Sequence, residues 1–457
     1  MTRVVTATSV EAMTDTLSRP HQARVVLERP MTSSPVPTWP GAVWVGGIDL
    51  AEVPADDAGH VALRDAEGHR TARLLVRDGT APLGFVDLPI HDGGCTVREL
   101  RAAVSALRPV DQPPLPVRLP ATTVVLCTRD RADQLRLALR SVLALDHPDF
   151  EVVVVDNAPS DDSTRALVES LADDPRLRYV REDVPGLSSA RNAGVRAARS
   201  DVVAFTDDDV VVDPAWLRGI AAGFSRGDDV VCVSGLVASG ELRTPAQQYF
   251  DDRVTWSRNL APRVHRLSTP PVDRPLFPFA VGDYGTGANF AMRRRAILDL
   301  GGFDEALGVG TVTGGGEDID MFARVVLSGA ALVVEPSALV WHRHRSDLAA
   351  LRTQATGYGT GLGAWLTKTA LQPRTLGMAL ARAPRALRHL LVGDAVRAAP
   401  APAPVGATGG VDAPTDDAFL REVARVRWVE LGAVGRGVFR YVRSRRTVRA
   451  RRRSSAR

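Results

Sequence analysis

Cysteine, aromatic residues and long apolar runs are all scarce in this chain of 457 residues. The three cysteines, Cys95, Cys127 and Cys232, are odd in number, widely spaced and in no CxxC pattern. This arrangement argues against a disulfide framework and against structural zinc, and it predicts reduced thiols in a cytosolic compartment.

Apolar stretches long enough for a membrane span are also missing. No uncharged apolar run reaches the roughly 18 residues that a transmembrane helix needs. The first residues, MTRVVTATSVEAMTDTLSRP, lack the apolar core of a signal peptide. Hydrophobic residues still make up 45% of the chain, enough for the cores of two or three domains. We therefore expect a cytoplasmic, globular protein.

Acidic residues are absent from the C-terminal end. After Glu430 there is no Asp or Glu, whereas residues 431–457 carry ten arginines mixed with Val, Phe and Tyr. Such a basic amphipathic tail is typical of segments that lie on an anionic membrane surface, at the inner face of the cell membrane in this case. A disordered solubilising tail is equally compatible with the composition, and nucleic acid is the less favoured partner.

The N-terminal part of the chain divides into three regions. Residues 1–36 are polar and rich in Ser, Thr and Pro, which predicts disorder. Residues 37–108 contain short β-like runs, a turn at Asp78-Gly79 and one helical stretch, which predicts a small β-rich domain. Residues 109–120 form a proline-rich linker.

The remaining chain predicts an α/β domain followed by helices. Over residues 121–345, continuous apolar strands alternate with amphipathic helices, a pattern typical of a mostly parallel sheet with helices on both faces. Residues 346–430 are predicted to form basic amphipathic helices, with a flexible segment at 398–417, before the tail.

Polar residues follow several of the predicted strands. They are Thr128 and Asp130 after the first strand, Asp156 after the second, and Asp207 to Asp209 after a later one. Ligands of parallel sheets bind beyond the carboxyl ends of the strands, so these residues are candidates for function. Neither GxGxxG after the first strand nor GxxxxGK[ST] occurs, so neither a dinucleotide fold nor a P-loop is supported.

The run Asp207-Asp208-Asp209 follows the buried strand Val202 to Phe205. Adjacent carboxylates repel one another and become protonated on burial unless a cation offsets their charge. Hard oxygen ligands suit Mg²⁺ or Mn²⁺, so the run predicts a divalent metal site. The alternative is a solvated acidic turn before the next helix.

Seven motifs in this order carry a resemblance: TRDR (128–131), VVDNAPSDDS (154–163), GLSSARNAG (186–194), FTDDD (205–209), GTGANFAMRR (285–294), GGGEDIDM (314–321) and WHRH (341–344). Together they resemble the family 2 glycosyltransferases of the GT-A fold, over roughly residues 121–345. The resemblance implies inverting transfer of a sugar from a nucleotide-diphosphate donor, with a divalent metal, Mg²⁺ or Mn²⁺, and no covalent glycosyl-enzyme.

The resemblance also implies roles for individual residues. The implied donor contacts are Thr128, Asp130, Asp156, Arg191, Asp207 and Asp208; the implied metal ligands are Asp207, Asp209 and His342; the implied acceptor or sugar contacts are Gly287, Asn289 and Trp341. Asp318 would be the catalytic base, and Glu317 would hold acceptor hydroxyls. A surface salt bridge for Arg191 and an ordinary hydrogen bond for His342 stay open as alternatives.

We therefore expect a glycosyltransferase whose acceptor is a cell-surface glycan or a lipid-linked intermediate. Two other functions remain compatible with an α/β scaffold of this kind. A sugar-1-phosphate nucleotidyltransferase would need a glycine-rich loop after the first strand, which TRDR does not provide. A non-catalytic nucleotide- or carbohydrate-binding protein would not need the acidic clusters.

Overall fold

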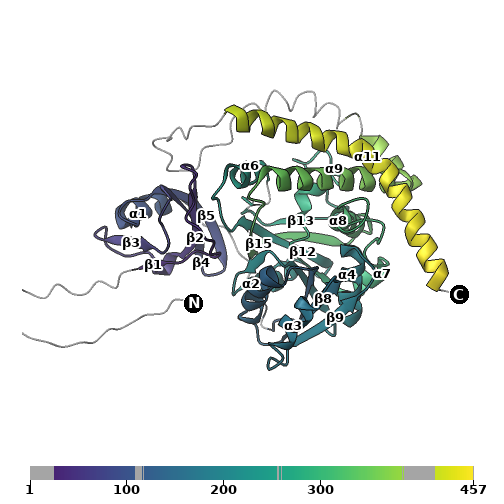
Figure 1. Cartoon of the computed structure of the whole chain (residues 1–457), viewed down its shortest axis with the longest axis horizontal. Helices are drawn as coiled ribbons and strands as arrows, with labels where there is room; N and C mark the ends of the chain where they lie inside the picture. Colours follow the sequence, from purple (N-terminus) through teal and green to yellow (C-terminus); the bar gives the residue numbers. More distant parts are fainter. Residues whose placement is uncertain are drawn as a thin grey trace, which may run out of the picture.

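The computed structural model describes residues 25–108, 116, 118–254, 257–258, 260–382, 384 and 417–455. Residues 1–24 of the predicted disordered segment lie outside the described residues. So do most of the predicted linker and nearly all of the predicted flexible segment at 398–417. Figure 1 shows a small N-terminal domain beside a larger α/β domain, with two long C-terminal helices lying over the larger domain.

The N-terminal domain is rich in β-structure, as predicted. Its elements are β1 (Val26–Leu27), β2 (Val43–Asp49), the 3-10 helix η1 (Leu50–Glu52), β3 (His60–Leu63), β4 (Thr71–Asp78), β5 (Ala81–Pro89), β6 (Gly94–Thr96) and α1 (Val97–Ser105). They form two three-stranded sheets, of order β1-β3-β6 and β2-β4-β5. Thr96 and Glu99 cap the start of α1 reciprocally, which stabilises its first turn. Buried Trp44, Leu74 and Leu100 lie in one core between the sheets and α1.

The larger domain is built on a nine-stranded sheet. Its strands are β7 (Thr122–Thr128), β8 (Phe150–Asn157), β9 (Leu177–Glu182), β10 (Val202–Asp207), β11 (Val210–Val212), β12 (Val230–Ser239), β13 (Arg263–His265), β14 (Asn289–Arg293) and β15 (Ala331–His342). The order is β11-β15-β12-β14-β10-β7-β8-β9, and β13 also pairs with β15. Only β11, β13 and β14 run against the other strands, so the sheet is mostly parallel.

Helices cover both faces of this sheet. The helices of this domain are α2 (Ala132–Leu143), α3 (Ser163–Glu169), α4 (Leu187–Ala197), α5 (Trp216–Phe224), α6 (Pro245–Arg253), η2 (Val281–Tyr284), α7 (Arg294–Asp299) and α8 (Glu317–Leu327). Successive strand residues point to opposite faces: Val124 packs with α2, α3 and α5, whereas Val125 packs with α4, α7 and α8. The predicted α/β fold class is confirmed.

The two domains share an apolar interface. Trp341 of β15 packs with Val45 and Leu75 of the N-terminal domain. Beside this cluster, Arg73 pairs with Asp251 at 3.0 Å and Arg77 with Asp213 at 2.5 Å. Charged pairs at the rim of an apolar contact fix the orientation of the two surfaces.

Two long helices complete the described chain. They are α9 (Leu348–Ala370) and α11 (Asp417–Ser455), which lie side by side in Figure 1. Residue 431, where the arginine-rich tail was predicted to begin, lies inside α11, so the described part of that tail continues a helix. None of the helices in the described ranges combines the length and apolarity needed to cross a membrane.

Candidate active site

The carboxyl ends of three neighbouring strands bring the predicted polar residues together. Strand β7 pairs in parallel with β8 on one side and with β10 on the other. In this register Thr128 lies opposite Asp156, and Cys127 lies opposite Asp207. The acids after separate strands therefore share one edge of the sheet, as the sequence predicted.

Asp208 is the buried member of the triple aspartate. Its Oδ2 accepts a hydrogen bond of 2.7 Å from Thr128 Oγ1, and its Oδ1 accepts one of 3.1 Å from Arg131 Nη1. Burial and the charge of Asp209 raise the pKa of Asp208. Because both oxygens are occupied, Asp208 and Thr128 order the strand ends and hold Arg131 in place.

Asp209 is surrounded by cationic side chains. Its Oδ1 lies 3.2 Å from His342 Nε2, and its Oδ2 lies 3.7 Å from Arg345 Nη2 and 3.8 Å from Arg131 Nη1. Burial by itself would raise the pKa of Asp209, but His342, Arg345 and Arg131 together hold it well below its usual range. Asp209 is therefore a stable carboxylate at neutral pH.

Asp207 is the open member of the run, with 32% of its side chain exposed. Its nearest cation is Arg191, whose Nη2 lies 3.8 Å from Asp207 Oδ1. The surrounding protein raises the pKa of Asp207 to about 7: desolvation contributes most, Asp209 and Asp208 add to it, and Arg191 and His342 oppose it. A cation at this position would relieve the excess negative charge.

Arg191 joins this acidic run to the second one. The guanidinium is buried and donates to Glu317 Oε1 at 2.9 Å and to the Gly287 carbonyl at 3.0 Å. Gly287 N in turn donates to Asp318 Oδ2 at 2.8 Å. The alternative of a surface salt bridge is thereby excluded for Arg191, because its ion pair lies in the interior.

Glu317 and Asp318 open helix α8 but differ in environment. Glu317 is buried, and its Oε2 has no hydrogen-bond partner among the described residues. Burial, with the neighbouring charge of Asp318, raises the pKa of Glu317 to about 7. Asp318 is only partly buried, and both of its oxygens accept backbone N–H groups, those of Gly287 and Ile319.

Asp156 presents a buried oxygen that lacks a partner in the described part of the chain. Its Oδ2 accepts a hydrogen bond of 2.9 Å from Tyr179 Oη, whereas its Oδ1 accepts none. Burial raises the pKa of Asp156. An unsatisfied buried acceptor is costly, so it is a natural partner for a donor group on a ligand. Asp130 lies close by in a left-handed conformation (φ 54°) and accepts the Ser160 N–H at 2.8 Å.

Two predicted contact residues lie elsewhere. Asn289 is fully buried: its amide donates to the Leu236 and Ala338 carbonyls and accepts from Trp216 Nε1, so it cross-links the core instead of touching an acceptor. Trp341 lies in the interface between the domains, where it cannot stack on a sugar ring. In strand β15 it points to the face opposite His342, because adjacent residues alternate.

A hydrogen-bonded chain behind His342 was not predicted. His342 Nδ1 lies 3.0 Å from His344 Nδ1, and His344 Nε2 lies 2.8 Å from Ser239 Oγ. Ser239 Oγ donates to Asp251, which pairs with Arg73 of the N-terminal domain. Arg131 was also missed as a functional residue, although it belongs to TRDR. The sequence signal for this series of hydrogen bonds was limited to the two histidines of WHRH, which are two residues apart. Ser239 and Asp251 are remote from them in sequence.

The donor atoms at the strand ends fit a divalent metal that arrives with a diphosphate. Asp207 and Asp209 offer hard carboxylate oxygens, and His342 offers an imidazole nitrogen next to Asp209. Over the described ranges, no three His, Cys, Asp or Glu side chains are arranged as a ready-made metal site. Mg²⁺ is usually held by one or two carboxylates together with substrate phosphates, and the open Asp207 suits that mode.

Comparisons with known proteins match part of this site to a family. The family model described as "Glycosyl transferase family 2" matches residues 123–301, which include Asp156, Arg191 and the triple aspartate. Glu317, Asp318 and His342 lie beyond the matched span.

The chain is similar to several curated proteins with functional names, three of which follow. Pre-mycofactocin glycosyltransferase of Mycobacterium tuberculosis is 31% identical over 52% of this chain and 46% of its own. Succinoglycan biosynthesis protein ExoO of Rhizobium meliloti is 32% identical over 52% and 65%, and validoxylamine A glucosyltransferase of Streptomyces hygroscopicus is 30% identical over 47% and 54%. The chain thus spans about half to two thirds of the length of these relatives.

Among solved structures, a mannosyltransferase from Pyrobaculum calidifontis in complex with GDP-Man and Mn²⁺ aligns with 75% of this chain and 93% of its own, at 20% identity and a TM-score of 0.45. The family match spans the sheet from β7 to β14 and includes the acidic residues at the ends of β8 and β10. Residues 123–301 of this chain therefore match glycosyltransferase family 2, and they lie in a mostly parallel α/β sheet.

Proposed function

We propose that the protein transfers a sugar from a nucleotide-diphosphate donor to an acceptor hydroxyl, with inversion at the anomeric carbon. The observation that carries this proposal is the convergence of two acidic clusters through Arg191. The guanidinium pairs with Glu317 at 2.9 Å and lies 3.8 Å from Asp207. The cluster that we propose binds the diphosphate and the cluster that we propose accepts the proton are therefore linked by one side chain.

The donor side is assigned to the ends of β8 and β10. The unpartnered Asp156 Oδ1 is suited to a ribose hydroxyl or a base N–H. Arg131 and Arg345, both near Asp209, supply positive charge for the diphosphate. A bound divalent metal at Asp207 and Asp209 would offset the charge that develops on the departing nucleoside diphosphate.

We assign the catalytic base to Asp318. It is more accessible than Glu317, and the two backbone N–H bonds hold its carboxylate in one orientation. Asp318 accepts the proton of the acceptor hydroxyl while the acceptor oxygen bonds to the anomeric carbon. The bond from that carbon to the nucleoside diphosphate breaks on the opposite face, which inverts the configuration.

Substitution of each acid of α8 tests this assignment. We expect Asp318→Asn to lower transfer at least about 100-fold, the lower end of general-base contributions, with donor affinity nearly unchanged. Glu317→Gln keeps the side-chain volume but weakens the support of Arg191, so its loss should be smaller. Transfer would be measured as nucleoside diphosphate release, and donor affinity by calorimetry. Wild-type turnover in Asp318→Asn would reject this base.

Product analysis separates the alternative functions. A sugar-1-phosphate nucleotidyltransferase releases pyrophosphate from a nucleoside triphosphate, whereas the proposed transferase releases a nucleoside diphosphate from a nucleotide sugar. A binding protein releases neither. The intact carboxylates at both clusters favour the transferase.

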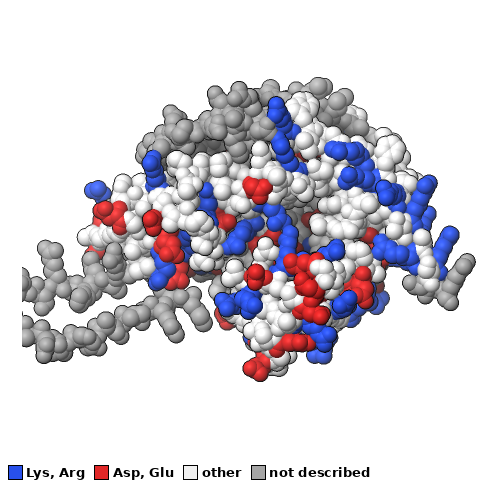
Figure 2. All heavy atoms as spheres, viewed as in Figure 1, with Lys and Arg blue, Asp and Glu red and all other residues white. Residues whose placement is uncertain are grey.

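We also propose that the acceptor is a glycan or lipid-linked intermediate at an anionic membrane surface. The outward side of α11 exposes Trp428 and Phe439, at 73% and 80% of their surface. Figure 2 shows blue cationic side chains gathered along the same helix. Aromatic residues flanked by arginines are typical of helices that lie in a membrane interface.

Vesicle flotation tests the membrane proposal. Trp428→Ser with Phe439→Ser should remove most binding to vesicles that contain phosphatidylglycerol, because both side chains would insert at the interface. The matched control, Leu137→Ser with Leu298→Ser, changes two exposed apolar residues of the catalytic domain and should bind like the wild type. Equal flotation of all three proteins would refute the assignment of α11.

A further inference from the structure

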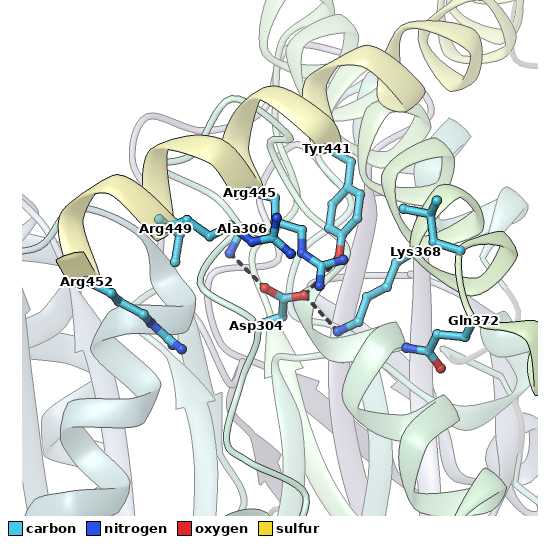
Figure 3. Close-up of a pocket in the computed structure, with 10 residues that line it drawn as sticks. Asp304, Ala306, Lys368, Gln372, Tyr441, Arg445, Arg449 and Arg452 are labelled. Carbon is cyan, nitrogen blue, oxygen red and sulfur yellow. Dashed lines mark hydrogen bonds and ion pairs between the residues drawn. The ribbon is translucent and has the colours of Figure 1, made fainter.

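A polar cavity lies away from the acidic clusters. Its volume is about 380 Å³, and it opens between α11, the end of α9 and the segment that follows α7 (Figure 3). The lining residues are Asp304, Ala306, Lys368, Leu371, Gln372, Tyr441, Arg445, Val448, Arg449 and Arg452. No acid of the candidate active site lines this cavity, so it is a separate feature of the molecule.

Three arginines of one helix face supply most of its charge. Arg445, Arg449 and Arg452 are spaced by four and three residues, which places them on the same side of α11. Figure 3 shows them following one another along the helix, with Arg445 next to Asp304 and Tyr441. Helical spacing therefore builds a row of guanidinium groups along one wall.

Asp304 is the carboxylate that lines the cavity, and a cationic side chain already compensates its charge. Asp304 pairs with Lys368 Nζ at 2.8 Å and accepts a hydrogen bond of 3.2 Å from Tyr441 Oη. Burial alone would raise the pKa of Asp304, but Lys368 and the hydrogen bonds lower it below its ordinary value, so it stays ionised. Lys368 is shared with Asp320 of α8, also at 2.8 Å.

The arginines, in contrast, are mostly uncompensated. Arg452 lies 3.6 Å from Glu305. Within the part of the chain that the structure describes, no carboxylate lies within ion-pair distance of Arg445 or Arg449. The cavity therefore has an excess of positive charge that its own walls do not offset.

We propose that this cavity binds a phosphate group, as a phosphate monoester or a diphosphate. Guanidinium groups match phosphate oxygens in two-pronged hydrogen bonds, and Gln372 adds an amide donor to the wall. The volume lies in the range of small-molecule sites, about 300–1,000 Å³. The same chemistry is offered by the headgroup of an anionic phospholipid and by a free phosphorylated metabolite. The proposal does not depend on the proposed sugar transfer.

Binding of inorganic pyrophosphate to the full chain tests whether the cavity takes a free phosphorylated compound. Titrations would be done with chelator present, so that no divalent metal brings pyrophosphate to Asp207 and Asp209. We expect Arg445→Gln with Arg449→Gln to raise the dissociation constant at least about tenfold. The matched control, Arg443→Gln with Arg446→Gln, removes the same charge from residues of α11 that do not line the cavity, and should bind as the wild type does.

Vesicle flotation with the same two pairs of variants tests whether the cavity takes the headgroup of an anionic phospholipid. Binding to phosphatidylglycerol vesicles is compared with binding to phosphatidylcholine vesicles. A loss confined to Arg445→Gln with Arg449→Gln supports the cavity in either assay, and the assay in which it occurs identifies the source. Gln372→Glu adds a negative charge without touching an arginine and should weaken binding in the same assay. Equal behaviour of both pairs in both assays overturns the proposal.

Discussion

At the scale of single residues, the structure separates side chains that look alike in the sequence. Asp207, Asp208 and Asp209 are consecutive, yet one is open, one is fully hydrogen-bonded and one is paired with cations. Strand β10 ends at Asp207, and the chain turns before β11 begins at Val210, so the three carboxylates point in different directions. Sequence spacing identified the cluster, but the partners of each acid come from remote segments.

His265 gives a prediction at this scale. It is buried in β13, and neither ring nitrogen has a hydrogen-bond partner among the described residues. Burial, with Arg263 and Arg274 nearby, lowers the pKa of His265 to about 4. The unfolded chain binds a proton below its pKa of about 6.5, whereas the folded chain does not, so stability falls as pH drops from 6.5 towards 4.

His265→Phe should remove this pH dependence. Between pH 7.5 and pH 5, the wild type should lose about 2 kcal/mol of unfolding free energy that the variant keeps. Urea unfolding at the two pH values measures the difference. Parallel losses in both proteins would show that His265 is not held neutral.

At the scale of elements, glycines bring α9 close to two other segments. A Cβ at Gly361 would lie 2.6 Å from the Gly315 carbonyl carbon, so α9 packs directly on the glycine segment that precedes Glu317. On another side, a Cβ at Gly363 would lie 2.0 Å from the Val434 carbonyl oxygen of α11. Helix α11 therefore supports α9, which supports the start of α8. The sequence predicted these helices but not this stacking.

A pair of alanine substitutions tests this packing. We expect Gly363→Ala to lower stability by about 1–3 kcal/mol, because the added methyl group forces the two helices apart. Gly435→Ala, on the open side of α11, meets no atom within 4 Å and should be neutral or stabilise by up to about 1 kcal/mol through helix propensity. Thermal unfolding monitored by circular dichroism measures both. Equal effects would contradict the close approach of α9 and α11.

At the scale of the whole molecule, the N-terminal domain is connected to the active site. Arg73 pairs with Asp251, and Ser239, His344 and His342 continue the chain of contacts to Asp209. The sequence predicted a separate β-rich domain without chemistry of its own. The structure shows that this domain covers one end of β15 and orders the residues behind His342.

Substitution of Trp341 tests the interface between the domains. Trp341→Ala should cost about 3–5 kcal/mol of stability, because the indole is buried between them. Trp341→Phe should retain much of this stability. Chemical denaturation, combined with transfer kinetics, distinguishes packing from sugar stacking. A raised acceptor KM with unchanged stability would restore the stacking role that the sequence suggested.

The order of apolar strands, amphipathic helices and acidic residues determined the α/β fold and the edge of the sheet where the acids meet. These properties follow from local periodicity and from the register of parallel strands, which a sequence carries directly. Only the tertiary structure decided that Trp341 and Asn289 are core residues, that Arg191 bridges the two acidic clusters, and that α11 and α9 enclose a cationic cavity. Each of these depends on side chains far apart in sequence, whose proximity arises only when the domains and helices pack.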